Sequence, residues 1–180
     1  MIIGLTGTNA SGKTSILKYL ISRGFEHHSL SDAIRAELTW RKMEHSRENM
    51  RLVGNELRER FGPSVLAVLI KKEIISANAV IDSIRNTYEV IELRKLPDFR
   101  LIALDAPVEI RFKRAMKRGR QENAVTVDSF RELEEREKSK DATAQNIDQC
   151  MQLADFHIYN DGTIEDLHAK LDHIIKEAFP

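Results

Sequence analysis

The chain has little cysteine, no excess of either charge and no long apolar run. Its single cysteine, Cys150, excludes an internal disulfide and favours a reducing compartment, and we expect it to be a buried apolar side chain. The 28 basic and 28 acidic side chains cancel, whereas nucleic-acid-binding proteins usually carry a basic excess. No stretch approaches the ~20 apolar residues of a membrane-spanning helix, and the first residues lack the basic start of a signal peptide. These absences predict a cytoplasmic protein that binds neither a membrane nor nucleic acid.

The 180 residues also contain no repeat and no linker rich in Pro, Gly or Ser, so we expect one domain spanning residues 1–180. Short apolar runs predict strands at residues 2–6, 25–30, 79–81, 101–104 and 156–159. Helical patterns cover residues 14–22, 33–42, 50–61, 64–76, 89–95, the segment after Pro107, and 164–178. Near-continuous apolar strands separated by helices are typical of a parallel sheet covered on both faces. The sequence therefore predicts a doubly wound α/β fold with a five-stranded parallel sheet.

Polar residues follow each of these strands at the point where the strand ends. They are residues 7–14, 31–35, 82–85, Asp105 and 160–163. Parallel α/β sheets bind their ligands at the carboxyl ends of the strands, so we expect all of these residues at one edge of the sheet.

The segment after the first strand matches the phosphate-binding pattern G-x-x-x-x-G-K-[ST]. Its glycines let backbone N–H groups point inward, and the following helix adds the positive end of its dipole. Lys13 is expected to reach the β- and γ-phosphates of ATP, and the Thr14 hydroxyl to ligate Mg²⁺. A random match in a chain of this length has a probability of about one in a hundred. The residues assigned to the nucleotide are Gly7, Thr8, Asn9, Ala10, Ser11, Gly12, Lys13, Thr14 and Ser15.

Kinases, GTPases and ATPases share this pattern, but the Asn-Lys-x-Asp motif that reads guanine in GTPases does not occur. From Met1 to about Ile175 the order of motifs resembles the nucleoside monophosphate kinase group, which includes adenylate kinases and the related dephospho-coenzyme A kinases. The segment 31–35 is similar to the Thr-Gly-Asp turn and following Arg of adenylate kinases. This similarity implies that Arg35 binds the acceptor phosphate, and that Asp32 acts near the attacking hydroxyl, as in dephospho-coenzyme A kinases. Taken alone, Asp32 also suits a helix N-cap and Arg35 a solvated helix charge.

The segment 82–86 resembles the Asp-Gly-Phe-Pro-Arg segment of adenylate kinases, with Ser-Ile in place of Gly-Phe-Pro. The resemblance implies that Asp82 supports the Mg²⁺ shell and that Arg85 grips the acceptor phosphate. An apolar strand ending in Asp opposite a phosphate-binding loop is also what a metal-organising carboxylate requires.

Arginines are densest between Arg114 and Arg136. Kinases of this group close an arginine-bearing lid over the triphosphate, which neutralises charge and excludes water. We expect such a lid at residues 118–136, with Arg118, Arg120 and Arg136 acting in catalysis. The alternative is a solvated amphipathic helix whose arginines pair with neighbouring glutamates. The loop around Asn160 is similar to the one that cups the nucleotide base in these kinases.

The segments 81–94, 105–107 and 118–120 are also similar to the P-loop domain that precedes the deaminase in certain deoxycytidylate deaminases. The zinc-binding motifs of a deaminase do not occur. The sequence therefore predicts Mg²⁺-dependent phosphoryl transfer from ATP to a small molecule, with a nucleoside or deoxynucleoside monophosphate as the first expectation. A module that senses ATP or deoxynucleotides without turnover, and a dephospho-coenzyme A kinase, are the alternatives. The partners expected are nucleotides, and both a monomer and a homodimer are left open.

Overall fold

The computed structural model describes residues 1–119, 126–136 and 146–179. Its strands are β1 (Ile2–Gly7), β2 (Glu26–Ser29), β3 (Ala79–Asp82), β4 (Phe99–Asp105) and β5 (Phe156–Tyr159). They form one five-stranded sheet in the order β2-β3-β1-β4-β5, and every neighbouring pair is parallel. The predicted doubly wound α/β fold is thereby confirmed.

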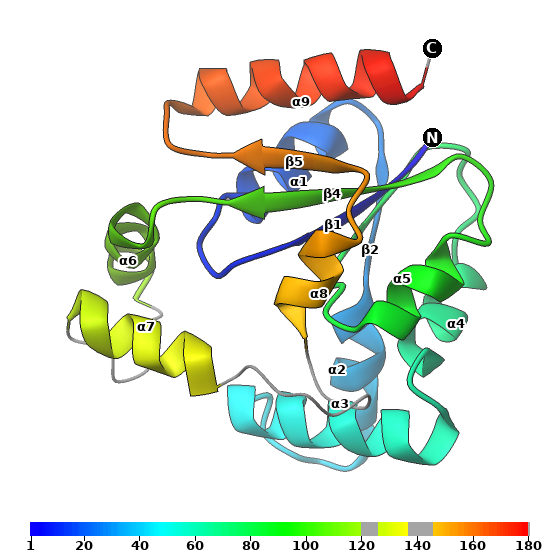
Figure 1. Cartoon of the computed structure of the whole chain (residues 1–180). Coiled ribbons are helices and arrows are strands. Elements are labelled where there is room, and N and C mark those ends of the chain that lie inside the picture. The colour runs from blue at the N-terminus through cyan, green and yellow to red at the C-terminus, as the bar shows by residue number, and fades with distance from the viewer. Residues whose placement is uncertain (120–125, 137–145, 180) are drawn as a thin grey trace.

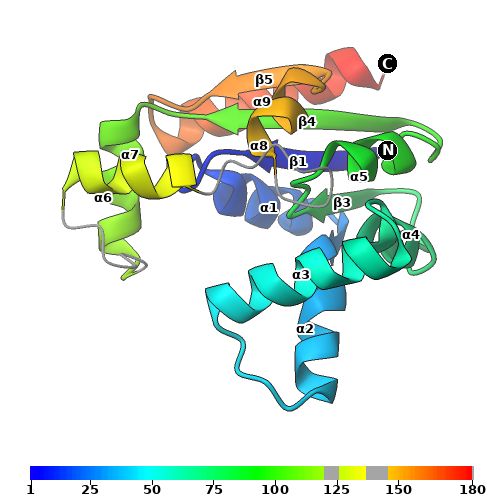
Figure 2. The same cartoon turned by 60° about the horizontal axis from the view of Figure 1, so that its bottom comes forward.

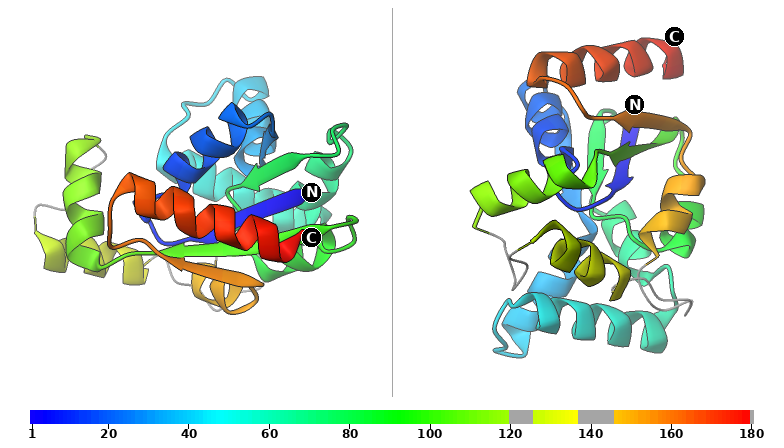
Figure 3. Two further views of the ribbon diagram at one scale, coloured as in Figure 1. Left: turned by 90° about the horizontal axis from the view of Figure 1, so that it is seen from above. Right: turned by 60° about the vertical axis from the view of Figure 1, so that its left-hand side comes forward.

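Helices cover both faces of this sheet, and they lie in two separate layers (Figures 1 and 2). The helices are α1 (Lys13–Ser22), α2 (Leu30–Trp40), α3 (Arg47–Phe61), α4 (Val65–Lys71), α5 (Thr87–Leu93), α6 (Val108–Lys117), α7 (Val127–Arg136), α8 (Ile147–Gln152) and α9 (Ile164–Ala178). Successive strand residues point to opposite faces, so Ile3 and Leu5 pack with α1 and α9 while Ile2 packs with α2 to α5 and α8. In two views that differ by 60°, α9 and α3 lie at opposite ends of the molecule with the sheet between them (Figures 1 and 3).

Local sequence explains where several helices begin. Asn86 and Glu89 form a capping box at the start of α5, and Thr163 and Asp166 form one at α9. Helix α2 begins at Leu30, directly after β2, with Ser29 as its N-cap, so Asp32 lies in the first turn of the helix. Helix α4 ends at Lys71, and α8 arises from a short segment for which the sequence predicted no helix.

The carboxyl ends of the strands lie at one edge of the sheet, and α6 and α7 project beyond that edge (Figure 1). Pairing Gly4 with Ile81, and Gly7 with Leu104, brings the loop after β1 between the ends of β3 and β4. Cys150 is buried, and burial is the main cause that raises its pKa to about 12. Among the residues that the structure describes, every helix is too short or too polar to cross a membrane.

Candidate nucleotide-binding site

The loop between β1 and α1 has a backbone that only small residues allow. Gly7 has a φ of +133°, and a Cβ atom at this position would lie 2.0 Å from the carbonyl oxygen of Leu104. Gly12 has a φ of +115°, and its Cβ would lie 2.3 Å from Nδ2 of Asn160. Asn160 is buried and donates from Nδ2 to the carbonyl oxygen of Ser11 at 2.7 Å. The loop is therefore held against both β4 and the segment after β5.

Lys13 begins α1 at the end of this loop, and its ammonium group folds back over the loop. Its Nζ atom donates to the carbonyl oxygens of Gly7 and Thr8, each at 2.6 Å. The pKa of Lys13 is lowered to about 7, first by burial of the ammonium group and next by the positive charge of Arg85, while the charge of Asp82 acts in the opposite direction. The structure thus brings together three predicted site residues, Lys13, Asp82 and Arg85.

Asp82 ends β3 beside the loop. Its Oδ1 atom is buried and accepts no hydrogen bond from the described part of the chain, and Nε2 of His27 lies 3.7 Å from it. A buried carboxylate oxygen without a donor suits a cation or a cation-bound water. The Thr14 hydroxyl, at the exposed first turn of α1, is the second oxygen that would bind this cation. These two residues fit Mg²⁺, which takes few protein ligands and keeps several waters.

Asp32 and Arg35 lie one turn apart on α2, and they contact each other. Nη1 of Arg35 donates to Oδ1 of Asp32 at 2.5 Å, and both side chains are about half exposed. Neither is among the charged groups that shift the pKa of Lys13 most. The predicted acceptor arginine Arg35 thus pairs with Asp32 in this structure.

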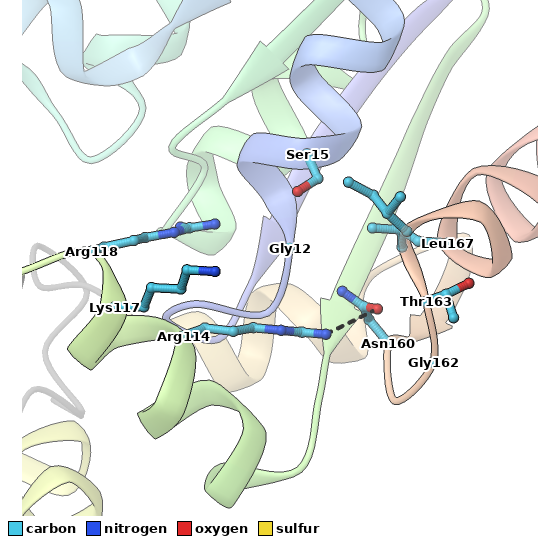
Figure 4. Close-up of a pocket in the computed structure, with 10 residues that line it drawn as sticks. Gly12, Ser15, Arg114, Lys117, Arg118, Asn160, Gly162, Thr163 and Leu167 are labelled. Atoms are coloured by element: carbon cyan, nitrogen blue, oxygen red, sulfur yellow. Dashed lines mark hydrogen bonds between the residues drawn. The ribbon is translucent and has the colours of Figure 1, made fainter.

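A pocket of about 280 Å³ opens between α6, the start of α1 and the turn before α9 (Figure 4). Its lining residues are Gly12, Ser15, Arg114, Lys117, Arg118, Asn160, Gly162, Thr163, Ile164 and Leu167. Nη2 of Arg114 lies 3.4 Å from Oδ1 of Asn160. An adjoining hollow of about 300 Å³ is lined by Thr14, Ser15, Lys18 and Arg118. The predicted residues Ser15, Arg118 and Asn160 therefore share one cavity, and two basic residues outside the predicted set, Arg114 and Lys117, line it as well.

The remaining predicted arginines cannot be placed in the same way. Arg120 lies outside the described residues, and Arg136 ends α7 with a side chain that is also outside them. The predicted lid region, residues 118–136, therefore contributes Arg118 and the helix α7 to the described site.

Asp105 was expected at this edge of the sheet without an assigned role, whereas Arg111 and Glu134 were missed from the sequence. Asp105, at the end of β4, accepts a hydrogen bond from the Thr8 hydroxyl at 2.7 Å. Arg111 of α6 is buried, donates from Nε to the carbonyl oxygen of Ala106 at 2.9 Å, and pairs with Glu134 of α7. Both Arg111 and Glu134 act on the pKa of Lys13. The helical spacing of Val108, Arg111 and Ala115 is the signal that would have indicated a buried position for Arg111.

Comparisons with known proteins identify the relatives of this chain. A family model described as an AAA domain matches residues 3–148. A UPF0200 protein of Sulfurisphaera tokodaii is 31% identical over 180 residues, which cover 97% of this chain and 96% of the relative. UPF0200 protein MJ1399 of Methanocaldococcus jannaschii is 32% identical over 186 residues, covering 98% of this chain and 90% of the relative.

Solved structures share the fold at lower sequence identity. TT1252 from Thermus thermophilus superposes with a TM-score of 0.63 at 21% identity, covering 98% of this chain and 97% of that one. Shikimate kinase from Acinetobacter baumannii, in complex with shikimate, superposes with a TM-score of 0.58 at 18% identity, covering 99% and 94%. The fold is that of P-loop kinases, as the resemblance to nucleoside monophosphate kinases implied.

Proposed function

Since the chain belongs to the UPF0200 family and carries an AAA domain of the P-loop type, we propose that it transfers the γ-phosphoryl group of ATP to a nucleoside or deoxynucleoside monophosphate. The products are ADP and a nucleoside diphosphate, because the new bond forms to a phosphate oxygen of the acceptor. The observation that carries this proposal is that β3 pairs with β1 and ends at Asp82, which puts Asp82 and Arg85 next to the loop that leads into α1 at Lys13.

The donor side follows from the loop and the pocket beside it. Lys13 is placed to bind the terminal phosphates once they displace its contacts with Gly7 and Thr8. The pocket next to Gly12 holds the rest of the nucleotide, with the guanidinium of Arg114 and the amide of Asn160 at its wall. Arg118 lines both this pocket and the hollow next to Thr14, so its guanidinium faces charge that develops on the transferred group.

Mg²⁺ is the cofactor that this site would hold, on Thr14 and through the Asp82 carboxylate. When bound, it neutralises phosphate charge that grows in the transition state. Asp82 is fixed at the tip of a buried strand, so its carboxylate needs little reorganisation to serve this role.

The acceptor side is proposed at Arg85 and Arg35. Both follow neighbouring strands, β3 and β2, and Arg85 already acts electrostatically on Lys13. Two guanidinium groups suit a dianionic phosphate better than a neutral hydroxyl compound, because each can bind phosphate through two parallel N–H donors. A monophosphate is therefore favoured over a neutral sugar as the acceptor.

The test is a panel of ribo- and deoxyribonucleoside monophosphates with ATP and Mg²⁺, assayed by coupled ADP release. Dephospho-coenzyme A, shikimate and gluconate serve as comparison acceptors, the last two because neighbours in fold are named shikimate kinase and gluconokinase. We expect turnover of at least one monophosphate. Turnover of a comparison acceptor alone would contradict the proposal.

The variant Asp82→Asn separates a kinase from a sensor. Its ATP affinity should stay within about tenfold of the parent chain, while phosphoryl transfer falls by a factor of about a hundred or more, since the metal acts mainly on transition-state charge. If the parent chain binds ATP tightly and transfers its phosphate to no acceptor, the sensing module is the better description.

A further inference from the structure

Arg58 of α3 and Glu89 of α5 form an ion pair in the interior of the protein. Their side chains are 2% and 0% exposed, and Arg58 donates from Nε and Nη2 to Oε1 of Glu89 at 3.0 and 2.8 Å. Buried pairs of this kind seldom add stability, because apolar side chains of similar size often stabilise a protein as well or better. The position of this pair therefore calls for a role other than stability.

The second oxygen of Glu89 indicates that role. Its Oε2 atom accepts the backbone N–H groups of Arg85 at 3.1 Å and of Asn86 at 3.0 Å. The Glu89 carboxylate thus connects the side chain of Arg58 on α3 to the backbone of the turn that carries Arg85.

The same turn is fixed on its other sides. The Thr6 hydroxyl donates to the carbonyl oxygen of Ile84 at 3.0 Å. The backbone N–H of Asn146 donates to the carbonyl oxygen of Arg85 at 2.7 Å. Ser83 adopts a φ of +62°, a conformation that costs a non-glycine residue energy and persists only where neighbours hold it. The backbone of Arg85 is therefore held at both its N–H and its carbonyl group.

Helix α3 also contacts the helix that carries the other predicted acceptor arginine. Gly54 lies one turn before Arg58, and a Cβ atom there would lie 2.9 Å from Cδ1 of Ile34, the neighbour of Arg35. Gly54 thus allows close packing of α3 against α2, while Arg58 reaches Glu89. One face of α3 therefore contacts both α2, which carries Arg35, and Glu89, which binds the turn that carries Arg85.

We propose that Arg58 and Glu89 are positioning residues for the acceptor phosphate, and that α3 sets the location of Arg85 relative to Arg35. Neither residue touches the acceptor. This inference rests on the proposed function, since it takes Arg85 as a ligand of the acceptor phosphate.

The test uses the double variant Arg58→Met/Glu89→Gln, which removes both buried charges together and keeps one side-chain oxygen for the turn. The matched control is Lys71→Met/Glu92→Gln, which removes a pair at 2.8 Å that also joins α5 to a neighbouring helix, α4, but does not reach the turn. The variant Arg58→Lys, which keeps the charge but lacks the Nε and Nη2 donors that converge on Oε1 of Glu89, is measured beside them.

Two readouts are taken on each folded variant. Calorimetry measures the affinity for AMP and dCMP in the presence of an unhydrolysable ATP analogue, and hydrogen exchange measures the backbone amides of Arg85 and Asn86. We expect the double variant to lose tenfold or more in monophosphate affinity, to exchange these two amides at least tenfold faster, and to keep its affinity for the ATP analogue. Arg58→Lys should fall between the parent and the double variant, and the Lys71/Glu92 control should match the parent.

The outcomes separate this inference from the proposed function. If the parent chain binds a monophosphate and the double variant binds it equally well, the positioning role is wrong and the kinase proposal stands. If the parent binds neither monophosphate and turns over none of the panel, the kinase proposal fails, and the exchange of the two amides still decides whether the pair fixes the turn. Unchanged exchange, or an equal change in the control, overturns the inference.

Discussion

At the scale of single residues, the lowered pKa of Lys13 predicts that ATP binding depends on pH. With a pKa of about 7, caused mainly by burial, Lys13 is mostly neutral in the free protein at pH 8. Bound phosphates favour the charged ammonium and raise this pKa, so binding at pH 8 should take up close to one proton. The affinity for ATP should accordingly fall as the pH rises above 7, by up to tenfold per unit.

Calorimetry in two buffers with different ionisation enthalpies measures the proton uptake directly. The variant Lys13→Met is the control, because it lacks the titrating group and should show a much weaker dependence on pH. Binding of ATP without proton uptake at pH 8 would contradict the assignment of Lys13 to the phosphates.

A second prediction at this scale compares two glycines that both have a positive φ. Gly24 has a φ of +86° and open space around it, whereas a Cβ on Gly7 would meet the backbone of Leu104. Gly24→Ala should therefore cost about 1 kcal/mol, the conformational strain alone. Gly7→Ala should cost more than about 3 kcal/mol or move the loop away from β4. Urea unfolding of the two variants measures the difference in their free energies of unfolding. Equal losses of stability would show that the loop can move away from β4 at little cost.

The sequence predicted the site best where a local pattern defines the geometry. The residues from Gly7 to Thr14 could be assigned because backbone conformation and helix dipole act within one short segment. Arg111 and Glu134 were missed, because their pairing depends on how α6 packs against α7. The pair of Asp32 and Arg35 is different, because the two residues lie three positions apart on one helix and helical spacing alone would have indicated their contact.

At the scale of elements, helix α7 packs against α6 through a buried aromatic side chain. Phe130 is buried and packs with Phe112 at a distance of 5.9 Å between ring centroids. Truncation of Phe130 to alanine removes about 1.5–3 kcal/mol of the free energy gained by burying this side chain. Phe130→Ala should therefore raise the rate of amide exchange in α7 by tenfold or more, while the amides of β1 and β4 stay protected. Phe61→Ala, at an exposed position on α3, is the matched control. Unchanged exchange in α7 would mean that the Arg111–Glu134 pair alone holds the helix.

The elements themselves were largely predictable. All of the strands were expected, because buried parallel strands are short, apolar and bounded by polar residues. Helix α4 ends earlier than its apolar pattern suggested, and the short helix α8 was not expected, since an element of six residues gives too weak a periodic signal. The position of α3 against both α2 and α5 depends on Gly54 and the Arg58–Glu89 pair, which no local pattern reveals.

At the scale of the whole molecule, ATP should raise the unfolding temperature. Ligand at a hundred times its Kd adds about 2.7 kcal/mol of stability, and in a protein of this size that corresponds to about 5–10 °C. Lys13→Ala should leave the unfolding temperature without ATP within about 2 °C of the parent and lose most of the shift, because a half-buried side chain at the loop leaves no core cavity. Differential scanning calorimetry measures the unfolding temperature without ATP and its increase with ATP. Lys176→Ala, on the exposed side of α9, is the control. A full shift in Lys13→Ala would argue that ATP binds elsewhere.

The hydrogen bond from Asn160 to the carbonyl oxygen of Ser11 joins residues 149 positions apart. During synthesis on the ribosome, the phosphate-binding loop is made well before Asn160, whose side chain holds it. A nascent chain that ends before β5 lacks both this side chain and the wall of the pocket beside the loop. The competence to hold a nucleotide is therefore acquired only after β5 and the segment that follows it have been made, and a chain released before then would carry the motif without the site.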